Sequence, residues 1–409
     1  MKLFRIWIYS IVMLLFLEVI KTIIGRITFP QSYFFSLVIS CIQVLILLGA
    51  LLIPLIYRLV SKRRRPLLWA VLLFLSIIAL LEGVANWMLY HPGKIPSWLM
   101  GSYIFYYDFL DRTIIQFEDD KTAYHPGLTY TLRPSATFEF SNVEFITRYR
   151  TNSMGLRDAE SSLKAPAVIC LGDSYAMGWG VEQSQTYPVQ LALLSGKNIL
   201  NTGISSYGTA REMELLKRTD QSNLQGLVIQ YCSNDVVENS EYIDHNFRLP
   251  IISEQEFESA QKSYVVNRFY FPGKVFLVIF QHYWKSVINR IYPLFSLPSE
   301  RIPARDESLQ AQRFAEILMH ASIDYRKVKV VVTRMNAYNF LKGNFMDQLQ
   351  LIASHAPYYE RFGKYIVLLD LKNILQPSDY FILDVHLRPS GHQKVADLLN
   401  RILFNNPAP

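Results

Sequence analysis

Three short blocks in the second half of the chain carry the side chains that acyl transfer to a serine requires. They are residues 172–174 (Gly-Asp-Ser), 233–235 (Ser-Asn-Asp) and 384–386 (Asp-Val-His). Ser174 supplies a hydroxyl that can act as a nucleophile, and His386 supplies an imidazole that can take its proton. Asp384 is close enough in sequence to orient that ring, and the Asn234 amide can donate to a developing oxyanion. Together they are the parts of a serine-dependent acyl-transfer site.

Ser174 alone does not decide this chemistry. Residues 168–174 are typical of a strand, a tight turn and the start of a helix, which places Ser174 at the carboxyl end of a strand. A serine at such a position commonly caps the helix instead. The Gly-X-Ser-X-Gly elbow of α/β-hydrolases is absent around Ser174, which excludes that family of esterases. We assign structural roles to Asp173 and His392.

The segments that must position these blocks alternate between short apolar runs and helical periods. The apolar runs lie at residues 167–171, 198–200, 227–231, 328–332 and 365–369. Because the runs are apolar on both faces and are separated by helix-like stretches, they predict a parallel sheet that helices cover on each side. The expected fold class is therefore α/β, a three-layer αβα sandwich with a mostly parallel sheet.

The order and spacing of the blocks resemble those of the SGNH (GDSL-type) hydrolase family, over about residues 145–404. The matching segments are residues 151–157, 174–181, 201–208, 233–235 and 384–392. This resemblance implies a flavodoxin-like sandwich in which Ser174 is the nucleophile, His386 the base and Asp384 its acid partner. It also implies an oxyanion hole made by the N–H groups of Ser174 and Ser206 and the side chain of Asn234. No metal and no organic cofactor is implied.

Three positions depart from the family pattern. Ser206 stands where a glycine is common, so its backbone angles must suit a residue with a Cβ. Cys232 replaces a usual glycine two residues before the asparagine. The last block is Asp-X-His with Leu383 in the usual acid position, so the site works as a Ser–His dyad if Asp384 cannot reach the imidazole. We expect Cys170 and Cys232, on neighbouring predicted strands, to be buried free thiols rather than a disulfide.

Two segments flank or interrupt this domain, which we place at residues 151–409. Residues 93–150 form an extracytoplasmic connector in which alternating residues predict a small antiparallel element. Residues 236–305 form an insertion that contains an amphipathic helix at 276–291. This helix either caps the domain core or lies in the membrane plane or over the substrate. Connector and insertion are the expected substrate walls.

Residues 1–92 are predicted to form three membrane-spanning helices. Residues 27–57 and 66–81 contain no charged side chain, the second run continues in apolar fashion to about residue 90, and residues 6–24 form a weaker segment. A span needs about 20 residues. A signal peptide is the competing interpretation of residues 1–24, but Glu18 and Lys21 occupy the place of a small-residue cleavage site.

Basic residues orient these helices. Residues 58–65 hold five Lys or Arg, whereas the preceding loop offers Arg26 alone. By the positive-inside rule the basic loop and the N-terminus are cytoplasmic, and the chain beyond about residue 92 is periplasmic. We therefore predict a multi-pass protein of a bacterial inner membrane. Glu18 and Glu82 fall within spans, where we expect Glu18 to pair with Lys21 and Glu82 to make an interhelix or interfacial contact rather than serve transport.

Net charge agrees with this division. The first 100 residues hold ten Lys or Arg and two acidic residues, a balance of +8, whereas the whole chain is +7, so the remainder carries −1. The basic balance therefore reflects membrane topology and not nucleic-acid binding.

The sequence predicts a membrane-anchored serine esterase that forms an acyl-enzyme from an ester-bearing envelope substrate, an O-acyl glycan or a lipid. Two alternatives stay open: an envelope polysaccharide O-acyltransferase that works with a membrane acyl-donor protein, and a non-catalytic envelope scaffold that retains the fold. A pocket closed by a large side chain such as Trp179 would favour acetyl groups, and a groove beneath the 276–291 helix would favour longer chains. The expected partners are the bilayer and the acylated substrate.

Overall fold

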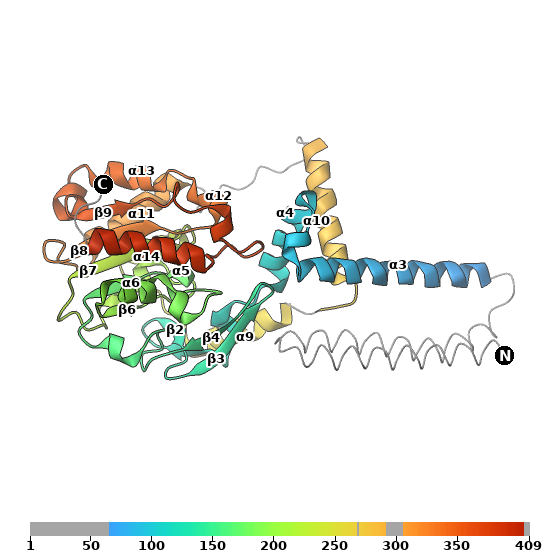
Figure 1. Ribbon diagram of the computed structural model, residues 1–409, viewed down its shortest axis with the longest axis horizontal. Coiled ribbons are helices and arrows are strands. Elements are labelled where there is room, and N and C mark those ends of the chain that lie inside the picture. Colours follow the sequence, from blue (N-terminus) through green and yellow to red (C-terminus); the bar gives the residue numbers. More distant parts are fainter. Residues whose placement is uncertain (1–64, 268–269, 292–305, 405–409) are drawn as a thin grey trace. The chain divides into compact units, whose positions relative to one another are not determined.

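The computed structural model describes residues 65–267, 270–291 and 306–404 (Figure 1). The chain divides into two units, residues 1–87 with 271–276, and residues 88–270 with 277–409. The predicted spanning segments at 6–24 and 27–57, together with Glu18, lie outside the described residues. The three-span prediction is therefore tested only for its last segment.

That last segment is the helix α3 (Arg65–Leu89). Within the described ranges, its stretch Leu72–Leu89 is the one helix long and apolar enough to cross a membrane, and only 17% of it is buried. Glu82 accepts hydrogen bonds from the backbone N–H groups of Val275 (3.3 Å) and Phe276 (2.8 Å), in the first turn of α10 (Lys274–Ile291). This is a contact of the interhelix kind that the sequence predicted for Glu82.

Five parallel strands form the sheet of the second unit. They are β5 (Val168–Leu171), β6 (Ile199–Asn201), β7 (Gly226–Tyr231), β8 (Lys329–Arg334) and β9 (Ile366–Leu369). Their order is β6-β5-β7-β8-β9, and every neighbouring pair is parallel. Each strand overlaps a predicted apolar run, with ends that differ by one or two residues, so the predicted parallel α/β sheet is confirmed. The strand order places β5 and β7, which lead into the first two blocks, side by side.

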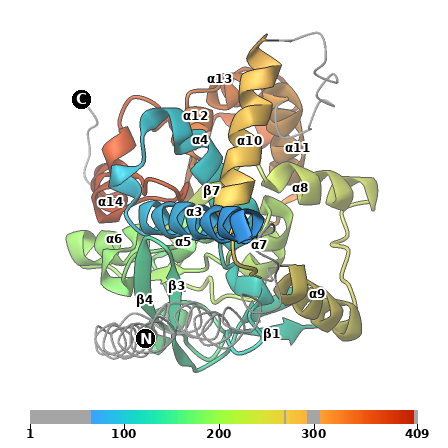
Figure 2. The same ribbon diagram turned by 90° about the vertical axis from the view of Figure 1, so that its right-hand side faces the viewer.

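Helices cover both faces of the sheet because alternate side chains of each strand are buried on opposite sides (Figures 1 and 2). Ile169 belongs to the core shared with α7 (Thr209–Leu216), α11 (Glu307–His320) and α13 (Phe345–Ala353). Cys170 belongs to the core shared with α6 (Tyr187–Ser195) and α14 (Pro389–Leu403). The result is the three-layer arrangement that strands apolar on both faces require.

Short helices complete the second unit. They are η2 (Pro92–Lys94), α4 (Ser97–Tyr106), η3 (Tyr107–Asp111), η4 (Ile115–Phe117), η5 (Glu160–Leu163), α5 (Ser174–Met177), η6 (Gln183–Gln185), α12 (Tyr338–Leu341), η9 (Tyr359–Gly363) and η10 (Pro377–Asp379). Of these, η3 is one turn of π-helix that continues α4 without a break. The insertion contributes α8 (Asp235–Asp244), α9 (Glu254–Asn267) and α10, which confirms the predicted helix at 276–291.

The connector contains two antiparallel hairpins, where the sequence predicted a small antiparallel element. One pairs β1 (Thr122–His125) with β2 (Thr129–Leu132), and the other pairs β3 (Thr137–Asn142) with β4 (Phe145–Arg150). The second hairpin packs Phe140, Phe145 and Tyr149 around Trp179. Because Trp179 lies just beyond α5, this aromatic cluster joins the connector to the segment that carries Ser174.

Candidate active site

Ser174, His386 and Asp384 form a continuous hydrogen-bonded chain. His386 Nε2 lies 2.7 Å from Ser174 Oγ, and His386 Nδ1 bonds to Asp384 Oδ1 on the other side of the ring. Ser174 and His386 are only 8% and 6% exposed, and Asp384 is buried. The structure thus brings together the three residues that the sequence singled out, and Asp384 does reach the imidazole although Leu383 occupies the usual acid position.

Ser174 is presented by the turn between β5 and α5. Asp173 caps α5, because its Oδ1 accepts the backbone N–H of Tyr175 at 2.9 Å. The capping role therefore falls to Asp173, for which the sequence predicted a structural role, and leaves the hydroxyl of Ser174 for His386. A Cβ at Gly172 would lie 2.3 Å from Gln230 Oε1 and 2.7 Å from Ala176 Cβ, so only glycine allows this tight turn.

Two further side chains donate to the carboxylate of Asp384. The Tyr107 hydroxyl bonds to its Oδ2, and Trp179 Nε1 donates to the same oxygen at 3.1 Å. The Trp179 indole also stacks on the His386 ring at a centroid distance of 4.9 Å and an interplanar angle of 20°. Trp179 thus lines the cavity, as the sequence suggested. Its main contacts hold Asp384 and His386 in place.

The loop that carries Asp384 is itself fixed by Glu144 of the connector. The Glu144 carboxylate accepts the backbone N–H groups of Ile382 (2.8 Å), Leu383 (2.6 Å) and Asp384 (2.9 Å). Leu383, in the usual acid position, is buried and contributes to packing, so the acid of this site is supplied by Asp384. The geometry of Asp-X-His is therefore set by a carboxylate that lies 240 residues earlier in the chain.

Electrostatics keep Asp384 ionised. Burial by itself raises the pKa of a carboxyl group. At Asp384 this effect is outweighed by His386, by its hydrogen bond, and then by Arg112 and Tyr107, which together hold the pKa of Asp384 well below its usual value. An ionised Asp384 fixes the proton of His386 on Nδ1 and leaves Nε2 to accept the proton of Ser174.

The three residues that supply the predicted oxyanion donors line one cavity. The cavity measures about 270 Å³ and is lined by Ser174, Ser206 and Asn234 among others. Neither the N–H groups of Ser174 and Ser206 nor the Asn234 amide has an acceptor among the described residues. The structure therefore brings the three predicted oxyanion donors to one cavity, free to bind a ligand oxygen.

Ser206 takes the conformation that the usual glycine would take. Its φ is +62°, in the left-handed region that residues with a Cβ rarely adopt. Gln116 of the connector holds it there, since Gln116 Nε2 donates to Ser206 Oγ at 2.8 Å. The departure from glycine is thus compatible with the backbone that the donor needs. Cys232, the second departure, is buried and free, as is Cys170, which confirms the predicted thiols.

The connector supplies an ion pair to the cavity that sequence reasoning missed. Arg112 Nη1 lies 3.1 Å from Asp108 Oδ1, and both residues line the cavity. Tyr264 of α9 fixes this segment, because its hydroxyl donates to the Arg112 carbonyl at 2.5 Å. The i,i+4 spacing of Asp108 and Arg112 predicts an ion pair on a helix, but nothing in the sequence links that helix to Ser174.

His392 has the structural role expected of it. It is buried, and its Nδ1 accepts the backbone N–H of Tyr187 at 3.2 Å. Burial, with Arg157 and His386 nearby, lowers the pKa of His392 to about 3, so the ring is neutral. His392 therefore joins α14 to α6 and takes no part in the cavity.

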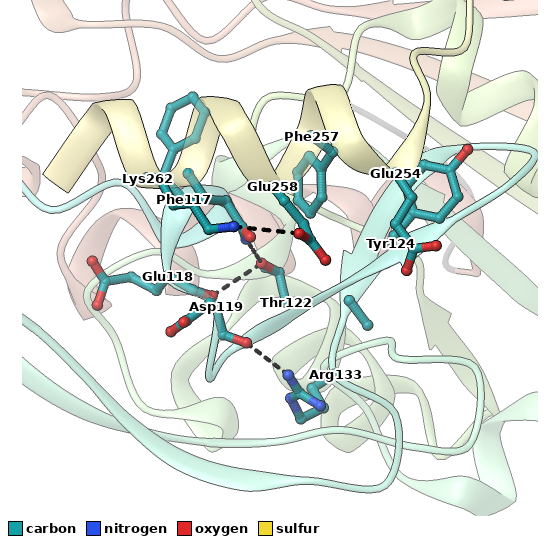
Figure 3. Close-up of a pocket in the computed structure, with 12 residues that line it drawn as sticks. Phe117, Glu118, Asp119, Thr122, Tyr124, Arg133, Glu254, Phe257, Glu258 and Lys262 are labelled. Atoms are coloured by element: carbon teal, nitrogen blue, oxygen red, sulfur yellow. Dashed lines mark hydrogen bonds and ion pairs between the residues drawn. The ribbon is translucent and has the colours of Figure 1, made fainter.

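A larger hollow of about 870 Å³ lies between the connector and α9 (Figure 3). Its lining includes Phe117, Tyr124 and Phe257, with charged residues such as Glu258 and Lys262, which form an ion pair at 3.5 Å. It contains no nucleophile paired with a base. Size therefore does not identify the reactive cavity, whereas the contacts of Ser174 do. Within the described ranges, no group of three or more His, Cys, Asp or Glu residues is placed to hold a metal ion.

Comparisons with solved structures give several likenesses, of which two are described here. No protein-family model matches the chain, and no curated protein matches it. A protein assigned to the G-D-S-L family of lipolytic proteins from Desulfitobacterium hafniense DCB-2 is 10% identical, with a TM-score of 0.31 over 58% of this chain and 98% of that one. The lipase Lip_vut3 from a goat rumen metagenome is 13% identical, with a TM-score of 0.29 over 58% of this chain and 99% of its own.

Proposed function

We propose that this protein is a serine esterase that works through an acyl-enzyme. The observation that carries the proposal is the chain from Ser174 through His386 to Asp384, beside a cavity with three unengaged donors. A buried serine whose hydroxyl lies 2.7 Å from a histidine nitrogen, with a carboxylate on the other ring nitrogen, has the arrangement of an activated nucleophile.

Each residue has one task in this mechanism. His386 Nε2 takes the proton of Ser174 as Oγ attacks the ester carbonyl, and the carbonyl oxygen becomes an oxyanion that the donors of Ser174, Ser206 and Asn234 stabilise. The protonated His386 then gives its proton to the leaving alcohol, and the acyl group stays on Ser174. His386 next takes a proton from a water molecule that attacks the acyl-enzyme. As the bond to Ser174 Oγ breaks and the acid is released, the protonated His386 gives that proton to Ser174 Oγ.

The same intermediate serves the O-acyltransferase alternative if a sugar hydroxyl replaces water. We treat hydrolysis as the primary activity, because it needs no acceptor site and no acyl-donor protein. The scaffold alternative rested on Ser206, Cys232 and Leu383. Gln116 holds Ser206, and Glu144 holds the loop that contains Leu383, so these two departures no longer argue against catalysis.

We further propose that α3 anchors the enzyme in a bacterial inner membrane and that the catalytic domain is extracytoplasmic. The apolar stretch Leu72–Leu89 and the basic run at 58–65 that precedes it support this orientation. The substrate is an ester-bearing glycan or lipid of the envelope, and the bilayer is a partner of the protein.

The test uses the full chain in detergent and then in lipid nanodiscs. Chromogenic esters from acetyl to long-chain are compared, with Ser174→Ala as the inactive variant. Ser259→Ala, at an exposed position of α9 outside the cavity, is the matched serine change. We expect turnover that Ser174→Ala abolishes, and a fluorophosphonate label on Ser174. Turnover that survives Ser174→Ala, or no turnover together with no labelling, contradicts the proposal.

A further inference from the structure

The helix α10 has a second apolar surface that does not face the protein. Its inner side packs on α4: Tyr283 meets Trp98 at a ring centroid distance of 5.2 Å, and His282 stacks on Phe105 at 4.3 Å. The residues Leu277, Phe280, Trp284 and Ile288 are large and apolar, yet all four are exposed. Figures 1 and 2 both draw α4 beside α10, so this contact uses only one side of the helix.

The four exposed residues, which we call the outer stripe, share one side of the helix. Their spacing of three and four residues places them in one row along α10. Trp284 and Ile288 are 47% and 51% exposed, values far above those of core residues. The exposed polar residues Gln281 and Lys285 border the row. An apolar row with a polar border on an exposed helix is the pattern of a helix that lies in a membrane interface.

The path of the chain shows why a lipid bilayer is within reach of the outer stripe. The helix α3 ends at Leu89 and α4 begins at Ser97, so the residues between them can span at most about 25 Å. The first turn of α10 bonds to Glu82, which lies within the apolar stretch of α3. The length of chain after α3 therefore limits how far the start of α4 can lie from the end of the apolar stretch, and the bond to Glu82 ties the first turn of α10 to that stretch.

These helices expose side chains that bilayer interfaces favour. Trp87, Trp98 and Trp284 are all exposed, Trp98 by 62%. Tryptophan is enriched at the level of lipid headgroups, because its ring is apolar while its N–H needs a polar partner. Exposed tryptophan on both α4 and α10, two helices in contact with each other, fits a lipid surface better than water.

We propose that the outer stripe of α10, together with Trp98 of α4, lies in the headgroup and acyl-chain boundary of the membrane that α3 crosses. This inference rests on the membrane anchoring proposed above. It goes further, because it adds a second contact between the protein and the bilayer besides the spanning helix. Phe105 connects His282 of α10 to Phe109, which is 73% exposed and follows the cavity residue Asp108. These ring contacts join the proposed lipid-facing helix to a neighbour of a cavity residue, which suits an ester carried by the membrane.

The test is site-directed spin labelling of the full chain in vesicles of phosphatidylethanolamine and phosphatidylglycerol. Cys41→Ser removes one native cysteine, and the other two are buried. Single cysteines replace Trp284 and Ile288 in the outer stripe, Leu80 in α3 as a marker of anchoring, and Asp120 as an exposed aqueous control. Accessibility to oxygen, which partitions into lipid, is compared with accessibility to a water-soluble nickel complex.

We expect labels at Trp284 and Ile288 to lie about 5–10 Å below the headgroup surface, with high oxygen and low nickel accessibility, and the label at Asp120 to behave as in water. Nickel accessibility at both stripe positions equal to that at Asp120 overturns the inference. So does low accessibility to both probes, which would mean that protein, such as a second copy, covers the stripe. If the label at Leu80 gives a lipid signal while the stripe labels do not, anchoring by α3 holds and only the inference about the outer stripe fails. Esterase activity is measured separately, so the proposed activity is tested on its own.

Discussion

Asp384→Asn tests whether the acid orients the base. In the native site Asp384 Oδ2 accepts from Tyr107 and Trp179, and Oδ1 faces His386 Nδ1. In the variant, we expect the amide oxygen to take the place of Oδ2, because the side chains of Tyr107 and Trp179 both donate there. At Oδ1 the backbone N–H of His386 (3.1 Å) is the one fixed donor, since the ring can change its tautomer. The amide NH2 group then faces His386 Nδ1, which has to accept a hydrogen bond, so the proton moves to Nε2 and His386 can no longer take the proton of Ser174.

The size of the effect follows from this wrong tautomer. A triad with the ring proton on the wrong nitrogen loses roughly 10⁴-fold in kcat, which corresponds to about 5 kcal/mol of transition-state stabilisation. The Tyr107 hydrogen bond contributes about 1 kcal/mol to fixing the amide. Tyr107→Phe combined with Asp384→Asn should therefore recover at most about fivefold, because Trp179 still orients the amide.

The assay is the second-order rate of fluorophosphonate labelling of Ser174, which needs no knowledge of the natural substrate. Asp370→Asn makes the same chemical change at a residue paired with Lys372 at 2.9 Å, outside the site, and should label at the native rate. The melting temperature of each variant shows that it is folded. A loss below tenfold in Asp384→Asn would mean that Ser174 and His386 work as a dyad, and the tautomer argument would be wrong.

Three further predictions concern the donors, the buried histidine and the packing beneath the nucleophile. Asn234→Ala should lower esterase kcat by roughly 10²–10³-fold, whereas Ser206→Gly should keep it within about threefold because glycine accepts the φ of +62°; the reverse ranking contradicts the donor assignment. His392 has a folded pKa of about 3 against an ordinary 6.5, so the unfolded chain binds the proton first and stability is complete above about pH 6.5. Stability should fall by up to about 1.4 kcal/mol per pH unit below that point, as measured by denaturant unfolding, and the slope should be smaller in His392→Gln. Gly203→Ala would bring a Cβ to 2.2 Å from a main-chain nitrogen and should lower the melting temperature strongly, whereas Gly101→Ala, with nothing within 4 Å, should not; equal effects would refute the packing argument.

The connector shows where sequence reasoning stopped. Alternating residues predicted its antiparallel element, but the strand β1 went unrecognised, and nothing marked Tyr107, Arg112 or Glu144 as neighbours of Asp384. Tyr107 bonds to a residue 277 positions away, and Glu144 to one 240 positions away. Periodicity reports which side of a segment is buried, and it carries no information on which distant segment lies against it.

The amphipathic helix shows a related limit. Its apolar pattern predicted α10 correctly, and three uses were left open: a cap on the core, a helix in the membrane plane, and a cover over the substrate. The structure divides the apolar residues between an inner side that meets α4 and an exposed outer stripe. The sequence pattern marks residues as apolar without showing which of them contact protein, so only the folded structure separates the inner side from the outer stripe.

The sequence by itself determined the sheet and the candidate reactive residues. Strands apolar on both faces must be covered by helices, and the carboxyl ends of parallel strands bring Ser174 and Asn234 to one edge. Tertiary structure decided what those residues can do. Whether Asp384 reaches His386 depends on Glu144, Tyr107 and Trp179, and whether Ser206 presents its N–H depends on Gln116. These are angles and distances of a few ångströms fixed by contacts between remote segments, and no local pattern of residues encodes them.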